Sequence, residues 1–343
     1  MNIRKNAFAI AAIALLGCTF GPAVAADEVV LKVHHFLPPS GTNQKHFIEP
    51  WCEKISTESA GRLKCQIYPA MQLGGTPSQL FDQAKDGVAD IVWTIPSYQG
   101  GRFPVTEVFE LPFMVRSAEH SSPVVWDILT RYATQEYKPV KPLLFHLHDG
   151  AQLHATAKPL KSANDLRGLK IRAATRQSTR LLKELGATPI GMPVPQVTES
   201  LSKGVIDATM LPWEVVPTLK VHEVAQFHTE MDPSAPMLSN TVFVFAMNRA
   251  RYDSLPPELK RVIDTNSGAA ASAWVGKVFD AARAVGRKPA EEQGNQIHVV
   301  PPQEMASWYE AGDRVAAQWV EETEAKGYPA GKILADTKAA LAR

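Results

Sequence analysis

The chain has 343 residues, of which 36 are Lys or Arg, 35 are Asp or Glu and 45% are hydrophobic. Ordinary apolar content with balanced charge excludes a disordered or collagen-like chain. The small net charge excludes the basic surface that a nucleic-acid binder needs to neutralise phosphates. Because single hydrophobic cores stop growing at roughly 250–300 residues, the length indicates two domains.

The first residues have the pattern of a secretory signal peptide. A cationic start at Arg4 and Lys5 precedes an apolar run at 7–16, and a stretch of small residues follows. The apolar run is shorter than the about 20 residues of a membrane span. We therefore predict that residues 1–25 are a signal peptide, cleaved at its end, and that the mature protein is exported.

The three cysteines raise two further questions. Cys18 follows Leu-Leu-Gly, which is similar to a lipoprotein cleavage box, so a lipid anchor on Cys18 is the alternative to a free soluble protein. Cleavage after the signal peptide leaves Cys52 and Cys65. An even count in an exported chain predicts one disulfide closing a short loop, with two buried thiols as the alternative.

Strand and helix patterns alternate from the start of the mature chain. We predict strands at 29–36, 63–68 and 88–94, and helices at 43–59 and 77–86. Strands that alternate with helices are typical of βαβ units and a mostly parallel sheet covered on both faces. The chain is therefore expected to have an α/β fold.

A similar unit recurs later in the chain. Residues 79–90 (QLFDQAKDGVAD) and 196–207 (QVTESLSKGVID) share a Gln, a helical stretch, a Gly eight residues on, and then Val, an apolar residue and Asp. Glycine at such a position caps the helix in the left-handed conformation, and the chain turns directly into a strand. The similarity predicts two α/β lobes of similar construction.

The second half continues the alternation and ends in long helices. We predict strands at 169–172, from Thr188 and at 240–247, and helices at 175–185, 258–293 and 303–325. At about 1.5 Å per residue, one helix over 258–293 would reach across both lobes.

Common catalytic motifs are absent. The chain contains no G-x-S-x-G, H-E-x-x-H, P-loop, C-x-x-C or G-x-G-x-x-G sequence, which removes the familiar hydrolase and dinucleotide-binding interpretations. Absence of these motifs alone does not exclude an enzyme, but we predict a binding protein that is not an enzyme and needs no cofactor.

Histidines offer a metal receptor as an alternative. His146 and His148 share one face of a predicted strand, with His154 close by, and alternate strand histidines can bind zinc. No acidic or cysteine partner stands at a convincing spacing. We therefore expect polar groups hydrogen-bonded to backbone, and no metal site.

Arg172 is the sharper indication of a binding site. It ends a strand that looks interior, at the carboxyl edge where open α/β sheets bind ligands. A guanidinium matches a carboxylate bidentately, and burial strengthens the pair; a structural ion pair is the alternative. Arg176 and Arg180 continue along the following helix and are predicted to be solvated.

Aromatic residues stand close to the ends of strands. Trp93 ends a strand, Tyr98 follows in a loop rich in Pro and Gly, and Trp213 follows the strand after the second repeat. Aromatic side chains at such places can form the wall of an apolar ligand pocket, although core packing explains each of them singly.

Several of these segments together resemble the solute-binding proteins, of the DctP type, that serve tripartite ATP-independent periplasmic (TRAP) transporters. The segments, in order, are LKVHHF at 31–36, GRLKCQIYPAMQLGG at 61–75, DGVADIVW at 86–93, GRFPVTEVFELPF at 101–113, DLRGLKIR at 165–172 and KGVIDA at 203–208. The resemblance implies a two-lobed Venus-flytrap fold with a long helix spanning both lobes. It also implies a periplasmic receptor that closes on an organic anion and delivers it to a membrane permease.

On this resemblance we expect two discontinuous lobes. The first comprises 26–149 and about 239–278, and the second comprises 150–238 and about 279–343.

The resemblance also assigns the binding residues. The family's carboxylate-binding arginine falls on Arg172, whereas a second arginine of its sialate and dicarboxylate binders finds no match near Gln152 and His154. Leu211 stands in place of an asparagine, and Phe36 in place of a polar residue. We therefore expect a monocarboxylate with apolar, aromatic, 2-oxo or 2-hydroxy character, with a C4-dicarboxylate as the alternative. The expected ligand-binding residues are Arg172, Trp213, Leu211, Trp93, Tyr98, His35, Phe36, Gln152 and His154.

Overall fold

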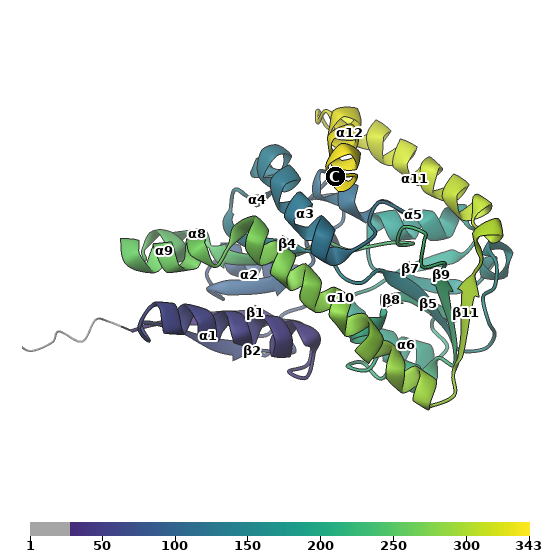
Figure 1. Cartoon of the computed structure of the whole chain (residues 1–343), viewed down its shortest axis with the longest axis horizontal. Coiled ribbons are helices and arrows are strands. Elements are labelled where there is room, and N and C mark those ends of the chain that lie inside the picture. The colour runs from purple at the N-terminus through teal and green to yellow at the C-terminus, as the bar shows by residue number, and fades with distance from the viewer. Residues whose placement is uncertain (1–27) are drawn as a thin grey trace, which may run out of the picture.

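The computed structural model describes residues 28–343, which form two α/β lobes, each built on its own sheet (Figure 1). The predicted signal peptide, its cleavage site and Cys18 lie outside the described residues. The α/β two-lobed architecture predicted from the sequence is confirmed.

The first sheet has five strands in the order β2-β1-β3-β10-β4. Its strands are β1 (Val29–His35), β2 (Leu63–Tyr68), β3 (Ile91–Thr94), β4 (Val140–His146) and β10 (Phe243–Asn248). β1 pairs in parallel with β2 and β3, whereas β10 is antiparallel to β3 and β4. β10 follows the strands β5–β9 in the chain and thus returns to the first sheet.

The second sheet has six strands in the order β11-β9-β5-β8-β6-β7. Its strands are β5 (Ala151–Ala155), β6 (Lys170–Ala173), β7 (Thr188–Gly191), β8 (Ala208–Pro212), β9 (Phe227–Met231) and β11 (Gln296–Val300). β6 is parallel to both neighbours, β7 and β8, whereas β5 is antiparallel to β8 and β9. β6 is therefore an interior strand, as predicted.

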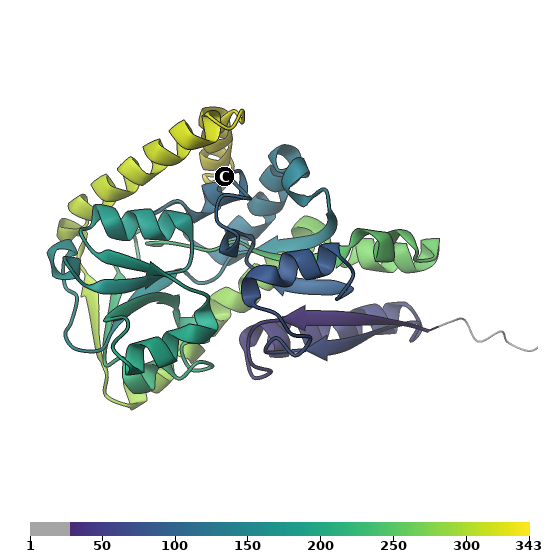
Figure 2. The same cartoon turned by 180° about the vertical axis from the view of Figure 1, so that it is seen from behind.

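Helices cover both sheets (Figures 1 and 2). They are α1 (Glu49–Glu58), α2 (Leu80–Lys85), α3 (Ala118–Tyr132), α4 (Thr134–Tyr137), α5 (Arg176–Glu184), α6 (Val197–Ser202), α7 (Val221–Val224), α8 (Arg249–Asp253), α9 (Pro257–Thr265), α10 (Gly268–Glu292), α11 (Ala306–Glu324) and α12 (Ala330–Leu341). None of the helices between residues 28 and 343 is both long and apolar enough to span a bilayer.

The repeated sequence forms the same corner in both lobes. In each copy a short helix ends at a glycine with positive φ, and the chain then enters a strand of the sheet. Asp90 Oδ2 accepts the backbone N–H of Lys32 at 2.8 Å, and Asp207 Oδ2 accepts that of Lys170 at 2.8 Å. The shared Asp therefore ties the start of one parallel strand to the next, and the prediction of two similar lobes is confirmed.

The strands of each lobe form a sheet of their own. β1–β4 and β10 build the first sheet, and β5–β9 and β11 build the second. The last helix differs, because α12 packs on α3 of the first lobe while α11 packs on α5 of the second. The C-terminal helical pair therefore joins the lobes a second time, along the top of Figure 1.

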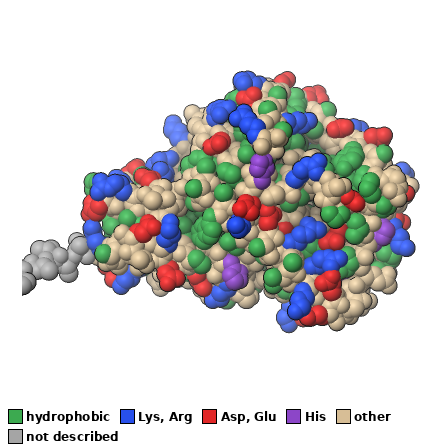
Figure 3. Space-filling model, in the orientation of Figure 1, with side chains coloured by type: hydrophobic (Ala, Val, Ile, Leu, Met, Phe, Trp, Pro, Cys, Tyr) green, Lys and Arg blue, Asp and Glu red, His purple; other side chains and the backbone are tan. Residues whose placement is uncertain are grey.

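The first lobe also contains a disulfide. Cys52 on α1 and Cys65 on β2 are joined, with their Cα atoms 5.8 Å apart, so the bond fastens a helix to an edge strand. On the face seen in Figure 3, acidic and basic side chains are interspersed, in keeping with the balanced composition.

The prediction of one helix over 258–293 is wrong at its start. The chain forms α9 and α10 with a break at 266–267, where Gly268 takes a φ of +84°. α10 still runs diagonally across both lobes and packs on α3, on β4 and on the 3₁₀ turn Trp213–Val215 (Figure 1).

Two glycines of α10 allow this close packing. A Cβ on Gly276 would lie 2.2 Å from the carbonyl oxygen of Ala118 in the first lobe. A Cβ on Gly286 would lie 2.1 Å from the carbonyl oxygen of Trp213 in the second. Backbone atoms cannot yield as a flexible side chain can, so both positions exclude any larger residue.

We therefore expect Gly286→Ala to lower the free energy of unfolding by about 2 kcal/mol or more, because the added methyl group overpacks the contact. Urea denaturation measures the loss. The control is Val285→Ala in the same helix, whose side chain is 72% exposed and whose loss should stay within about 0.5 kcal/mol. Equal stability of the two variants would contradict the packing described here.

Candidate functional site

A cavity with about 40 Å³ of room for the centres of water-sized molecules lies between the lobes. Both sheets contribute to it. The first-lobe side supplies Phe36, Leu37, Trp93, Ile95, Tyr98, His148, Ser239, Thr241 and Phe243, and the second-lobe side supplies Ala151, Arg172, Ala174, Ser178, Val194, Met210, Leu211, Pro212, Glu214 and Val215. Most of these side chains are apolar, and Arg172 is the one Lys or Arg among them.

Arg172 is buried in this wall without a carboxylate partner. Its side chain is on β6 and the residue is 2% exposed. Nε donates to the carbonyl oxygen of Met192 and Nη1 to that of Met210, each at 3.0 Å. Nη2 has no hydrogen-bond partner in residues 28–343, and no acidic residue there forms an ion pair with Arg172. Two carbonyls therefore fix the guanidinium and leave one amino group free.

Burial also affects the titration of this group. Desolvation lowers the pKa of Arg172 from its usual value. The pKa of an arginine is so high that the side chain nevertheless keeps its charge. A buried positive charge that lacks a partner is costly, and a bound anion would remove that cost.

Aromatic rings stack on one another in the first-lobe wall of the cavity. Phe36 stacks on Trp93 with ring centroids 4.9 Å apart, and Trp93 stacks on Phe243 at 4.7 Å with planes 8° apart. The Tyr98 hydroxyl accepts the backbone N–H of Val194 at 3.1 Å and so links the lobes. A planar apolar group suits such a wall, because stacked and edge contacts of aromatic rings add to the area that they bury.

Two histidines near the wall are neutral. His146 Nε2 accepts the indole N–H of Trp93 at 2.8 Å while Nδ1 donates to a carbonyl, and burial lowers the pKa of His146 to about 3. His148 Nδ1 accepts the N–H of Gly150 at 3.0 Å, and burial lowers its pKa to about 3 as well. The neutral ring of His148 therefore carries its proton on Nε2, as a donor in the cavity wall.

The metal alternative finds no support in this geometry. The rings of His146 and His154 are held by hydrogen bonds at both nitrogens. Throughout the part of the chain that the structure describes, no three His, Cys, Asp or Glu side chains are arranged to hold a metal ion.

Five of the nine expected ligand-binding residues line the cavity: Phe36, Trp93, Tyr98, Arg172 and Leu211. His35 and Gln152 are buried but do not line it. His35 hydrogen-bonds Gln44 at 3.0 Å, and Gln152 borders a separate cavity beside α10. Neither position could be distinguished from its neighbours by the sequence pattern.

His154 and Trp213 lie behind the cavity wall. His154 Nε2 donates to the carbonyl oxygen of Leu211 at 3.1 Å, and its Nδ1 lies 2.7 Å from His228 Nδ1. The Trp213 indole N–H donates to Glu230 at 2.6 Å. Both side chains support the segment that carries Leu211.

Sequence reasoning missed several polar residues of the cavity. They are His148, Ser178, Glu214, Ser239 and Thr241. His148, Ser239 and Thr241 belong to the two segments where the chain passes between the sheets. The available signal was position, since these three residues stand in or beside predicted strands at the crossovers between the lobes.

Burial raises the pKa values of several carboxyl groups in the molecule. Desolvation raises the pKa of Glu214 to about 8, and nearby Asp149 adds to the effect. It raises the pKa of Glu110 to about 8 and those of Asp149 and Glu136 to about 7. Glu110 Oε1 accepts the Ser97 hydroxyl at 2.7 Å. At neutral pH the surroundings of the cleft therefore carry less negative charge than the number of acidic residues there suggests.

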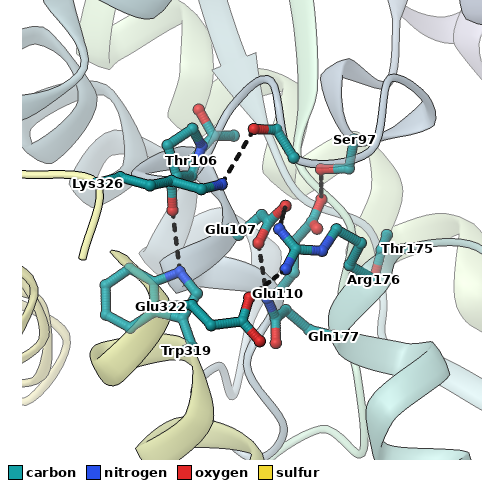
Figure 4. Close-up of polar contacts among 12 residues, drawn as sticks. Ser97, Thr106, Glu107, Glu110, Thr175, Arg176, Gln177, Trp319, Glu322 and Lys326 are labelled. Carbon is teal, nitrogen blue, oxygen red and sulfur yellow. Dashed lines mark hydrogen bonds and ion pairs between the residues drawn. The ribbon is translucent and has the colours of Figure 1, made fainter. Parts of the chain in front are cut away.

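A polar network joins the lobes beside the cleft (Figure 4). Glu107 of the first lobe accepts Gln177 Nε2 at 2.7 Å and lies 3.4 Å from Arg176 Nη1. Arg176 and Arg180 also pair with Glu322 of α11. The prediction that these two arginines are solvated is wrong, because α11 and the first lobe enclose them.

The family model described as DctP, bacterial extracellular solute-binding protein, family 7, matches residues 33–323. The chain belongs to this family. Its members are the solute-binding receptors of TRAP transporters, and the resemblance noted in the sequence is confirmed. The architecture of this solute-binding protein is likewise that of its solved relatives.

Three solved TRAP solute-binding proteins illustrate the likeness. One from Rhodoferax ferrireducens T118, in complex with copurified benzoate, is 45% identical with a TM-score of 0.90, covering 92% of this chain and 98% of that one. One from a marine metagenome, described as specific for aromatic acid ligands and bound to 3-hydroxybenzoate, is 42% identical with a TM-score of 0.90, covering 92% and 99%. One from Bordetella bronchiseptica with bound (R)- and (S)-mandelate is 27% identical with a TM-score of 0.84, covering 91% and 98%.

The buried carboxyl groups predict how stability depends on pH. The folded protein keeps protons on groups such as Glu110 up to about pH 8, whereas the unfolded chain releases them near the ordinary pKa of 4.5. Stability is therefore lost as the pH rises from about 4.5 to about 8. Above about pH 7.5 the histidines of lowered pKa are neutral in both states, because the ordinary pKa of an unfolded histidine is 6.5, so this loss then stands alone. We expect the free energy of unfolding to fall between pH 7.5 and 8.5.

Glu110→Gln should make that fall shallower, because the amide stays neutral and can still accept the Ser97 hydroxyl. Urea denaturation across the pH range measures the slope. Glu199→Gln is the control, since Glu199 is exposed and its pKa is lowered by Lys203. An unchanged slope in Glu110→Gln would refute the assignment.

Proposed function

We propose that this receptor captures an aromatic monocarboxylate in the periplasm and delivers it to its TRAP permease. The carboxylate pairs with Arg172, and the ring lies against Phe36, Trp93 and Phe243. The observation that carries the proposal is the free Nη2 of Arg172, the buried cation in a cavity whose other walls are largely apolar. The relatives that hold benzoate, 3-hydroxybenzoate and mandelate support the same ligand class.

The remaining polar groups of the cavity serve the ligand head group. Tyr98 and His148 stand near Arg172 closely enough to influence its charge and be influenced by it. Nε2–H of His148 donates to a carboxylate oxygen or to a 2-hydroxy or 2-oxo group beside it. An aromatic acid with a hydroxyl group on the carbon next to its carboxylate therefore fits as well as benzoate.

A C4-dicarboxylate is the weaker candidate. A second carboxylate needs a second cation, and Arg172 is the one basic side chain among the lining residues of the described cavity. We also propose that the chain is exported by cleavage after Ala25, binds its ligand unchanged and catalyses no reaction.

Benzoate at a hundred times its dissociation constant should stabilise the wild-type protein by about 2.7 kcal/mol, which raises its melting temperature measurably. Arg172→Met should weaken benzoate binding at least 30-fold, because loss of a buried charge pair removes several kcal/mol of binding energy. Calorimetric titration measures the affinities of both proteins.

Lys170→Met is the matched control, since it removes the same charge from an exposed position on the same strand. Its affinity for benzoate should equal that of the wild type. The proposal fails if no aromatic acid binds, or if Arg172→Met binds benzoate as tightly as Lys170→Met does.

A further inference from the structure

Glu214 is an unexpected residue in a cavity for anions. It lies in the 3₁₀ turn after β8, lines the cavity and is 5% exposed. Between residues 28 and 343 no basic side chain forms an ion pair with it. The Thr42 hydroxyl is its hydrogen-bond partner, and the adjoining lining residues Leu211 and Val215 are apolar.

Glu214 and Arg172 line the same cavity but have different neighbours. Arg172 is anchored through Nη1 to the carbonyl of Met210 on β8. Glu214 follows Met210 by four residues, after two further strand residues that each advance the chain about 3.3 Å. Besides burial, Asp149 and Thr42 act on the pKa of Glu214, whereas Tyr98 acts on that of Arg172. The two groups therefore stand at separate places along the cavity.

We propose that Glu214, at a separate place in the cavity from Arg172, determines specificity by hydrogen-bonding a hydroxyl group on the ring of the bound arylcarboxylate. This inference rests on the proposed function, because it presumes a carboxylate held by Arg172. The geometry assigns the ligand class more narrowly, as ring-hydroxylated aromatic monocarboxylates.

The protonation state of Glu214 makes this role compatible with an anionic ligand. An ionised carboxylate in the cavity wall would repel the ligand across a poorly screened space. Burial raises the pKa of Glu214 to about 8, so at neutral pH the group is a carboxylic acid. Its O–H donates and its carbonyl oxygen accepts, which suits a phenolic hydroxyl that can do both.

A site with buried polar groups also discriminates against a ligand that lacks the hydroxyl. Such a ligand forms no hydrogen bond with the acid of Glu214 while it removes that group from water, and an incompletely hydrogen-bonded buried group weakens binding. Benzoate is therefore expected to bind, but less tightly than the hydroxybenzoate whose hydroxyl reaches Glu214.

Calorimetric titration at pH 7 with benzoate and its 2-, 3- and 4-hydroxy isomers tests the proposal. In the wild type at least one isomer should bind about tenfold more tightly than benzoate. Glu214→Met has similar length and no hydrogen-bonding group, so that gain should vanish and the isomers should bind no more tightly than benzoate does. Glu214→Gln keeps a donor and an acceptor and should retain most of the gain.

The pH dependence supplies an independent readout. Benzoate affinity of the wild type should fall between pH 7 and 9, because ionised Glu214 repels the anion, and Glu214→Gln should fall less. Asp149, the other acid facing Glu214, itself faces Arg283 and Asp280. These groups are present in both proteins, so the difference between the two curves belongs to Glu214.

Two results would overturn the inference and separate it from the proposed function. If the four acids bind the wild type but no isomer exceeds benzoate, or the gain survives in Glu214→Met, the inference fails and the role of Arg172 stands. If none of the four acids binds the wild type, the proposed function itself fails.

Discussion

The guanidinium of Arg172 is the group on which the site depends. Its position on an interior strand removes it from water, and two backbone carbonyls hold it without neutralising it. Burial of a charge without a partner in the protein is unfavourable. In the proposed function a carboxylate supplies the opposite charge, and the aromatic rings beside it exclude water that would screen the pair.

The acids around the cleft follow the same logic. Asp149, Glu110 and Glu214 are buried, and desolvation keeps them protonated near neutral pH. Neutral histidines complete the pattern, since His146 and His148 have pKa values lowered to about 3. Arg172 is therefore left as the dominant charge at the cavity, which favours one anion over either a cation or a dianion.

Much of this could be predicted from the sequence where short-range rules apply. The repeated G-V-x-D segments predicted two similar lobes because a glycine-capped helix and a strand-tying Asp are local features. Arg172 could be predicted for a similar reason, because the sequence of a short strand indicates which residue stands at its carboxyl end. The break before Gly268 was missed because helical periodicity continues on both sides of it.

Other parts of the site depend on contacts far apart in the chain. Glu214, His148 and Thr241 reach the cavity only because the chain passes between the sheets at separate places, which no local pattern records. The opposite error arose at His154 and Trp213, whose side chains turn behind the wall toward His228 and Glu230. The positions of residues in the sequence thus predicted the right segments, but they did not predict the direction in which each side chain points.

The two glycines of α10 have a mechanical consequence. At Gly276 and Gly286 the helix touches the main chain of opposite halves of the molecule, with no side chain between to slide or rotate. Ten residues, about 15 Å of helix, separate these points. Any hinge motion that widens the gap between the halves must therefore bend or twist this stretch, or else break a contact. When the halves move apart, the resistance of these fewer than three helical turns to bending then contributes to the force that draws the halves together.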